Sequence, residues 1–263
     1  MQDLKITIVQ TDLAWRDAES NLQRFDRLID TISEPTDLII LPEMFTTGFA
    51  MEPEPLAEEP NSKTFNWMLN KASARKCAIT GSYIIKEDGE YYNRLYFVLP
   101  NGKSHAYDKR HLFRMAGEDK NFSPGSKKMI FKFKGWKICP MICYDLRFPV
   151  WSRNRFEQDV YEYDLLIYVA NWPEIRNHAW NTLLKARAIE NQAYVAGVNR
   201  IGYDGKGIPH SGDSAVIDPW GKVISQTQPQ QESVETVRLD ASKLIAYRSS
   251  LAFGMDQDKF QIL

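Results

Sequence analysis

The spacing of hydrophobic and polar residues in the N-terminal part of the chain predicts a strand, a helix and a second strand. Residues 4–10 alternate and are rich in β-branched side chains, which is typical of a strand. Apolar positions recur at helical spacing over residues 18–32, which predicts an amphipathic helix. Residues 37–41 are almost all apolar, as in a strand buried on both faces. Glu43 follows directly, so the pattern places a carboxylate just beyond a buried strand.

The middle of the chain predicts a helix and then a series of hairpin strands. Ser62 suits the N-cap of a helix that runs to Arg75. Strands are expected at residues 77–86, 92–99 and 104–107, because turn sequences separate these apolar runs. Two polar stretches, residues 52–60 and 108–128, are expected to be loops, and the first of them is a candidate lid. Long loops in compact domains are commonly functional.

The C-terminal half repeats the alternation of strand and helix. An apolar, strand-like run that follows Gly135 carries Cys143 at its end, and the sequence then changes to Tyr-Asp-Leu-Arg-Phe-Pro. The pattern then predicts a strand at 164–170, a helix at 178–191, a strand at 194–199, a hairpin of 211–217 with 223–226, a strand at 233–239 and a helix from Asp240 to Ser250.

These elements predict a layered α/β fold, with strands inside and helices on both outer faces. We expect one domain over residues 1–263, because no linker or repeat divides the chain. In such folds functional groups gather at strand ends. Glu43, Lys109 and Cys143 each follow a predicted strand, so they are the first candidates for a common site.

Composition narrows the class of protein. The formal net charge is −1 and basic residues do not cluster, so neither a nucleic acid nor a membrane surface is expected as a partner. Three cysteines in a chain of 263 residues disfavour a disulfide scaffold. The sequence shows no signal peptide and no apolar run long enough to span a membrane, so we expect a cytoplasmic protein. A small molecule or a second copy of the chain is the expected partner.

A cysteine at a strand end suggests covalent catalysis if other groups support it. The thiolate is the reactive form, so a base must remove the proton, and a positive charge must stabilise the oxyanion that forms on an attacked carbonyl. Glu43 can move the protons. Lys109 can face the oxyanion, together with a backbone N–H near Tyr144. Attack on an amide would give a thioester and ammonia, and water would then release the acid.

Each of these residues also has a purely structural interpretation. A lone cysteine at a strand end is more often a core residue, and Glu43 and Lys109 suit a helix cap and a charged surface. Cys77 and Cys139 are assigned to the core. The scattered histidines and the lack of a Cys-Gly-x-Cys-Trp sequence disfavour a cysteine–histidine protease. Cys139 and Cys143 lack a compact second ligand pair, so no zinc, other metal or cofactor is expected.

Three motifs together resemble those of the nitrilase, or carbon–nitrogen hydrolase, superfamily. They are Pro-Glu-Met-Phe around Glu43, Tyr-Asp-Lys-Arg-His-Leu-Phe around Lys109 and Ile-Cys-Tyr-Asp-Leu-Arg-Phe-Pro around Cys143. The likeness continues through Asn171-Trp172 to the Asp-Pro-Trp-Gly turn that begins at Asp218. It implies a four-layer αββα sandwich and a homodimer formed across an αββα–αββα interface.

The resemblance also implies roles for individual residues. Glu43 would be the general base, Lys109 the transition-state stabiliser and Cys143 the nucleophile. Glu118, which precedes Ser-Pro-Gly, would orient Lys109 or the substrate. The implied substrate-binding residues are Tyr144, Asn171, Trp172 and Arg176.

Within the superfamily the sequence is most similar to bacterial omega-amidases. This implies hydrolysis of the ω-amide of a small dicarboxylic acid, such as 2-oxoglutaramate or 2-oxosuccinamate. The same three residues would also serve a nitrilase or an N-carbamoyl-amide hydrolase, and a catalytically silent binding protein is a third possibility. Arg176 is the favoured anchor for a substrate carboxylate. For Arg147 the sequence suggests an ion pair with Asp145 or with a partner subunit, and for Arg200 a turn cap.

Overall fold

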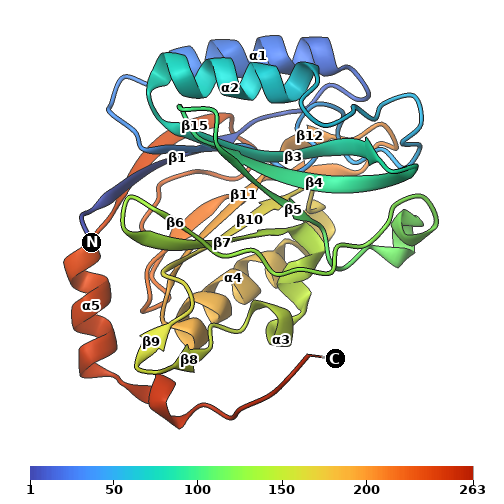
Figure 1. The fold of residues 1–263 in the computed structure, drawn as a ribbon. Helices are drawn as coiled ribbons and strands as arrows, with labels where there is room; N and C mark the ends of the chain where they lie inside the picture. The colour runs from blue at the N-terminus through green and yellow to red at the C-terminus, as the bar shows by residue number, and fades with distance from the viewer. Residues whose placement is uncertain (263) are drawn as a thin grey trace.

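The first of two stacked sheets is built around the N-terminal strand β1. The computed structural model describes residues 1–262 and is shown in Figure 1. β1 pairs in parallel with β2 and antiparallel with β15, which comes from the other end of the chain. The strand order is β15 (Ser233–Leu239), β1 (Leu4–Gln10), β2 (Leu38–Ile40), β3 (Ala78–Glu87), β4 (Glu90–Val98) and β5 (Ser104–Asp108).

The second sheet has a parallel centre with an antiparallel strand at each edge. β7, β10 and β11 run parallel, and β6 and β14 pair antiparallel with the outer two of them. The strand order is β14 (Ala215–Ile217), β11 (Tyr194–Asn199), β10 (Leu165–Ala170), β7 (Trp136–Ile142) and β6 (Phe131–Phe133). Two small hairpins lie outside the sheets, β8 (Phe156–Glu157) with β9 (Val160–Tyr161) and β12 (Ile201–Tyr203) with β13 (Pro209–Ser211).

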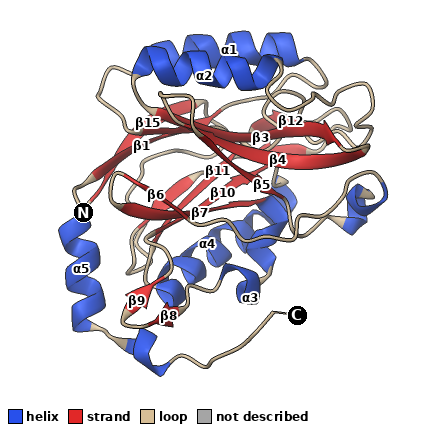
Figure 2. Cartoon of the chain, in the orientation of Figure 1, coloured by secondary structure: helices blue, strands red, loops and turns tan. Residues whose placement is uncertain are grey.

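Helices cover the outer face of each sheet, as Figure 2 shows. α1 (Ala18–Asp30) and α2 (Lys63–Arg75) lie over the first sheet, and α4 (Asn177–Asn191) and the short α3 (Pro149–Ser152) lie under the second. α5 (Ala241–Ser250) lies at the side of the molecule, and the C-terminal segment continues beneath the second sheet. The order of layers is therefore helix, sheet, sheet, helix, which confirms the predicted αββα sandwich.

Strand alternation explains how a single strand serves both layers of the core. In β2, Leu38 and Ile40 belong to the cluster between the two sheets, and Ile39 belongs to the cluster under α1 and α2. Successive side chains of a strand point to opposite faces, so a run without polar residues is required wherever both faces are covered. Close packing between the second sheet and α4 depends on Gly197 of β11, where an added Cβ would lie 2.5 Å from Leu184 of α4.

Most predicted elements are present near their predicted bounds. The strands predicted at residues 4–10, 194–199 and 233–239 are β1, β11 and β15, and Asp240 caps α5 through the Lys243 N–H as expected. α1 ends at Asp30 rather than at residue 32. The Ser62 side chain makes no capping hydrogen bond. Instead the Glu58 carboxylate accepts the Thr64 N–H of α2 at 2.7 Å.

The predicted hairpin of residues 211–217 with 223–226 is present only in its second half, and its first strand is wrong. Gly212 and Asp213 have φ angles of 79° and 55°, and this left-handed backbone ends one strand and precedes another. Ser211 therefore belongs to β13, and β14 begins only at Ala215. A single bridge between Ile217 and Val223 remains of the expected pairing.

Candidate active site

Glu43 lies in a tight loop that the neighbouring strand β3 holds in place. The loop follows β2, and Ser82 of β3 accepts hydrogen bonds from the Met44 and Phe45 N–H groups, through its Oγ and its carbonyl oxygen, both at 3.0 Å. Met44 has a φ angle of 42°, which turns the chain sharply after the glutamate. The Glu43 side chain is fully buried. The carboxylate is thus fixed in the interior by the backbone on either side of it.

Lys109 follows the edge strand β5 and is held by the pairing of β4 with β5. Arg94 on β4 binds the Asp108 carboxylate through two hydrogen bonds of 2.6 and 3.0 Å. The next residue, Lys109, donates its backbone N–H to Asn93 at 3.0 Å. Because side chains alternate along a strand, Asp108 meets Arg94 on one face and Lys109 points to the other. The Lys109 side chain is buried and its ammonium lies 5.0 Å from the centre of the Phe49 ring.

Cys143 occupies the first position after β7, where the strand turns into a 3₁₀ segment, η3 (Cys143–Arg147). Its φ angle of 43° is unusual for a residue with a side chain and costs on the order of 1–3 kcal/mol. Strained backbone of this kind is concentrated at functional sites. The turn places the thiol in the wall of a cavity, although only 8% of the residue is exposed.

The Lys109 ammonium joins two carboxylates in a fully buried cluster. Its Nζ lies 2.8 Å from Glu43 Oε1 and 2.9 Å from each oxygen of Glu118, which begins η2 (Glu118–Lys120). Burial alone would lower the pKa of Lys109, but Glu118 and Glu43 more than reverse this effect and raise it above its usual value. Burial also raises the pKa of Glu118, and the charge of Glu43 adds to that rise. Lys109 is therefore a permanent positive charge.

The surroundings of Cys143 keep its thiol protonated. Burial raises its pKa well above the usual value, and the Glu43 carboxylate raises it further, whereas Lys109 acts in the opposite direction. A thiol in this state is a poor nucleophile until a base removes its proton. Glu43 is a carboxylate beside the thiol, so it is placed where a proton acceptor would be needed.

Asp145 connects the loop that carries Cys143 with the loop that carries Lys109. One carboxylate oxygen accepts the backbone N–H of His111 at 3.0 Å and lies 2.7 Å from His111 Nδ1. The other accepts the Tyr107 hydroxyl at 2.7 Å and the Ile142 N–H at 3.0 Å. Asp145 is fully buried. The carboxylate thus fixes the position of Cys143 relative to the end of β5.

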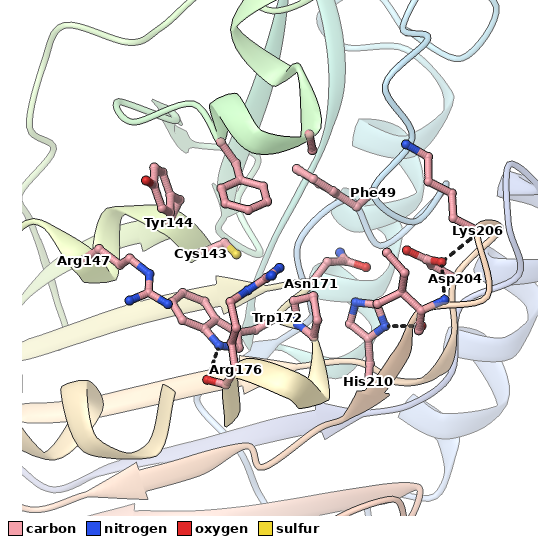
Figure 3. Close-up of a pocket in the computed structure, with 14 residues that line it drawn as sticks. Phe49, Cys143, Tyr144, Arg147, Asn171, Trp172, Arg176, Asp204, Lys206 and His210 are labelled. Carbon is pink, nitrogen blue, oxygen red and sulfur yellow. Dashed lines mark hydrogen bonds between the residues drawn. The ribbon is translucent and has the colours of Figure 1, made fainter. Parts of the chain in front are cut away.

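The cavity beside Cys143 brings together the four residues expected to bind substrate. Figure 3 shows Tyr144, Asn171, Trp172 and Arg176 around the thiol, and His210 and Lys206 farther along the cavity. Asn171 also supports the base, because its backbone N–H donates to Glu43 Oε2 at 2.8 Å. Trp172 donates its indole N–H to the Arg176 carbonyl at 2.8 Å, which holds η4 (Glu174–Arg176) against the cavity.

Arg147 and Arg200 have different surroundings, and within the described chain only Arg200 has the contacts that the sequence suggested. The expected ion pair of Arg147 with Asp145 is wrong, because the Asp145 oxygens are occupied by His111, Tyr107 and Ile142. Arg147 instead lines the cavity, with its guanidinium 4.9 Å from the centre of the Trp172 ring. Arg200 is buried, and it binds Asp12 and the carbonyls of Ile201 and Tyr203, so it does fasten a turn.

Two polar residues of the site were missed in the sequence. Asn93 contacts both buried carboxylates, but in the sequence it is one polar residue in a predicted strand. His210 is buried in the cavity wall, and its Nδ1 donates to the Ile208 carbonyl at 3.0 Å. Burial, with the Arg200 charge, lowers the pKa of His210 to about 4, so its imidazole is neutral at pH 7. The sequence signal for Asn93 is an amide within a strand that is otherwise rich in aromatic and aliphatic residues.

Residues 1–262 contain no group of three or more histidine, cysteine, aspartate or glutamate residues placed to hold a metal ion. In the same residues, no helix combines the length and apolar character needed to cross a membrane.

Residues 5–249 match the family described as carbon-nitrogen hydrolase. The chain belongs to this family. As a carbon–nitrogen hydrolase it is an enzyme, and the family match extends from β1 to α5, so it includes both sheets and every residue of the site described above.

Three relatives illustrate how similar this carbon–nitrogen hydrolase is to known proteins. It is 46% identical to omega-amidase YafV of Escherichia coli over 264 residues, with 100% of both chains covered. It is 31% identical to a 2-oxoglutaramate amidase of Bacillus subtilis, with 94% of each chain covered. Its fold matches the crystal structure of a CN-hydrolase superfamily protein from Xanthomonas campestris with an arsenic adduct in the active site, with a TM-score of 0.97, 41% identity and full coverage of both chains.

Replacing Asp145 with alanine should destabilise the protein. The change leaves the Tyr107 hydroxyl and two backbone N–H groups without their acceptor, and each buried unpaired donor costs about 1–3 kcal/mol. We expect the free energy of unfolding in urea to fall by about 3 kcal/mol or more. Asp30→Ala, at an exposed position, is the control and should stay within about 0.5 kcal/mol of the wild type. Equal stability of the two variants would show that Asp145 does not join the loops.

Proposed function

We propose that this carbon–nitrogen hydrolase is an omega-amidase that uses Glu43, Lys109 and Cys143 as its catalytic residues. The observation that carries the proposal is the buried Lys109 ammonium, which joins Glu43 and Glu118 beside a protonated thiol in a cavity wall. The similarity to YafV and to the 2-oxoglutaramate amidase supports an ω-amide of a small dicarboxylic acid as the substrate. 2-Oxoglutaramate and 2-oxosuccinamate are the proposed examples.

The reaction begins when Glu43 takes the proton of Cys143 and the sulfur attacks the amide carbon. The oxygen that becomes negative is stabilised by the Lys109 ammonium and by a backbone N–H near Tyr144. Glu43 then gives its proton to the leaving nitrogen, the carbon–nitrogen bond breaks, and ammonia departs from a thioester on Cys143. Glu43 next removes a proton from water, which attacks the thioester carbon. The carbon–sulfur bond then breaks, Glu43 returns the proton to the sulfur, and the acid and the thiol are released. Glu118 keeps Lys109 in place throughout.

Other features of the protein stay predictions. We propose that residues 1–263 form one domain, that two copies pair as a homodimer, and that the protein is cytoplasmic. The outer helical layer of the second sheet offers apolar side chains for pairing, because Val150 on α3 and Ile189 on α4 are 56% and 45% exposed.

Ammonia release from a panel of substrates tests the proposed reaction. We expect release from 2-oxoglutaramate and 2-oxosuccinamate, and much slower release from nitriles and N-carbamoyl amino acids of the same length. If a nitrile or a carbamoyl compound is hydrolysed fastest, the same catalytic residues serve a nitrilase or an N-carbamoyl-amide hydrolase reaction instead. No release from any compound would favour a silent binding protein.

Cys143→Ala should abolish turnover without unfolding the protein, because the variant lacks the nucleophile. Intact-mass measurement of the wild type, quenched during turnover, should show one acyl group on Cys143. Cys139→Ala is the matched control, since Cys139 is a buried core residue on the same strand. It should cost up to a few kcal/mol of stability and leave the adduct in place. An acyl group on a different cysteine would contradict the assignment.

The cavity also suggests how the far end of the substrate is held. Among residues 1–262, Arg147 and Arg176 both line the cavity and neither forms an ion pair. A guanidinium binds a carboxylate through two parallel hydrogen bonds. His210 is neutral and does not supply this charge. We propose Arg176 as the anchor, because the Trp172 contact fixes its backbone beside Asn171.

Substrate and enzyme changes made together test the role of Arg176. Replacing the substrate carboxylate with a neutral methyl amide should lower kcat/KM roughly 10- to 100-fold in the wild type. The same replacement should have little effect in Arg176→Ala, which has already lost the contact. Arg147→Ala is the comparison and should keep most of the wild-type discrimination. If Arg147→Ala loses it and Arg176→Ala keeps it, the anchor is Arg147.

A further inference from the structure

Asn93 is built into the charged cluster from a neighbouring strand. It lies on β4, is fully buried, and pairs with Ile84 of β3 on one side. On the other side its carbonyl accepts the backbone N–H of Lys109 at 3.0 Å. The strands on either side therefore fix the backbone of Asn93, and its position relative to Lys109 does not depend on a flexible loop.

The side-chain amide of Asn93 donates to the carboxylates that Lys109 joins. Its Nδ2 lies 2.8 Å from Glu43 Oε1 and 3.4 Å from Glu118 Oε1. Glu43 Oε1 therefore accepts from both Asn93 and Lys109, and Oε2 accepts from the Asn171 N–H. Ionised carboxylates only accept hydrogen bonds, so the amide has to turn its nitrogen toward them.

This orientation of the amide lowers the stability of the fold, so stability does not explain why an asparagine occupies the position. With the nitrogen facing the carboxylates, Asn93 Oδ1 is buried and has no hydrogen-bond partner within residues 1–262. A buried acceptor without a partner is unfavourable, and an apolar side chain of similar size would avoid the penalty. Groups that lower stability in this way are found where function requires them. The contact with Glu43 is the feature of the site that accounts for an amide here.

The charges around Glu43 explain why a neutral hydrogen-bond donor suits the position of Asn93. Glu43 is faced by Lys109 from the end of β5, by Glu118 from η2 and by Cys143 from η3. Two carboxylates thus share one ammonium in a site without solvent contact. A second ammonium would compete for the carboxylates, and a third carboxylate would add repulsion. An amide supplies a hydrogen bond and leaves the net charge unchanged.

We propose that Asn93 is a positioning residue whose side-chain amide donates to the Glu43 carboxylate and holds it beside the Cys143 thiol. It acts through Glu43 and does not contact the substrate. The inference rests on the proposed function, since it assumes that Glu43 is the base. It extends that proposal by giving β4 a part in catalysis and by predicting an effect on the ionisation of the site.

The test compares Asn93→Leu with the wild type across pH. Leucine keeps the branched shape of the side chain but removes the donor, so the Glu43 carboxylate loses a hydrogen bond. We expect kcat/KM for 2-oxoglutaramate to fall about 10-fold at pH 7, and its acidic limb to move up by about one pH unit. Tyr83→Phe is the matched control on β3, because that buried hydroxyl has no partner in the described chain, and it should keep the wild-type profile.

Alkylation of Cys143 by iodoacetamide gives a readout that does not need turnover. Its rate should show the same upward shift of the acidic limb in Asn93→Leu, since the thiol still needs Glu43 as its base. A wild type that is alkylated but hydrolyses no amide would overturn the proposed function alone. Unshifted profiles in a folded Asn93→Leu would overturn the role of Asn93 alone.

Asn93→Asp provides a second variant if the leucine protein does not fold. The side chain has the same shape but brings a third carboxylate to the single ammonium, so we expect a larger upward shift and a loss of kcat/KM of about 100-fold. Thermal unfolding of both variants establishes that they are folded. A folded Asn93→Asp with the wild-type profile would contradict the inference.

Discussion

The contact of the Lys109 ammonium with Glu43 and Glu118 is the interaction on which the rest of the site depends. All three side chains are withdrawn from solvent, and each ion would cost several kcal/mol to bury without its partners. They come from the end of β2, the end of β5 and the loop beyond it, so the cluster forms only when the first sheet is correctly assembled. The fold and the charge state of the site are therefore established together.

The cluster also accounts for the behaviour of the thiol. Burial raises the pKa of Cys143 and the Glu43 carboxylate raises it further, so the group that keeps the thiol protonated is also the group proposed to accept its proton. Burial also strengthens the effect of Glu43, because charges interact more strongly where water is excluded. A positive charge that stays protonated next to them suits an oxyanion that exists only during the reaction. No imidazole is needed for this chemistry.

The sequence predicted the parts of the molecule that depend on local pattern. β1 and β11 were found because buried strands need uninterrupted apolar residues, and the αββα layering followed from the family motifs. The first strand of the hairpin predicted for residues 211–217 with 223–226 was wrong, because Gly212 and Asp213 adopt a left-handed backbone that hydrophobic periodicity does not reveal. Asn93 was missed as a site residue because its partner Glu43 lies 50 positions before it in the chain. The contact of Asp145 with Tyr107, 38 positions before it, was not predicted for the same reason.

Turnover of Glu43→Gln with an ω-amide substrate tests the central claim most directly. Glutamine keeps the shape and size of the side chain but cannot take the thiol proton, so the account predicts a loss of roughly 100-fold or more in kcat, on the scale expected for removing an essential proton-transfer group. Thermal unfolding should show that the variant is folded. A folded Glu43→Gln enzyme with wild-type turnover would contradict the account, because the base would then have to be another residue.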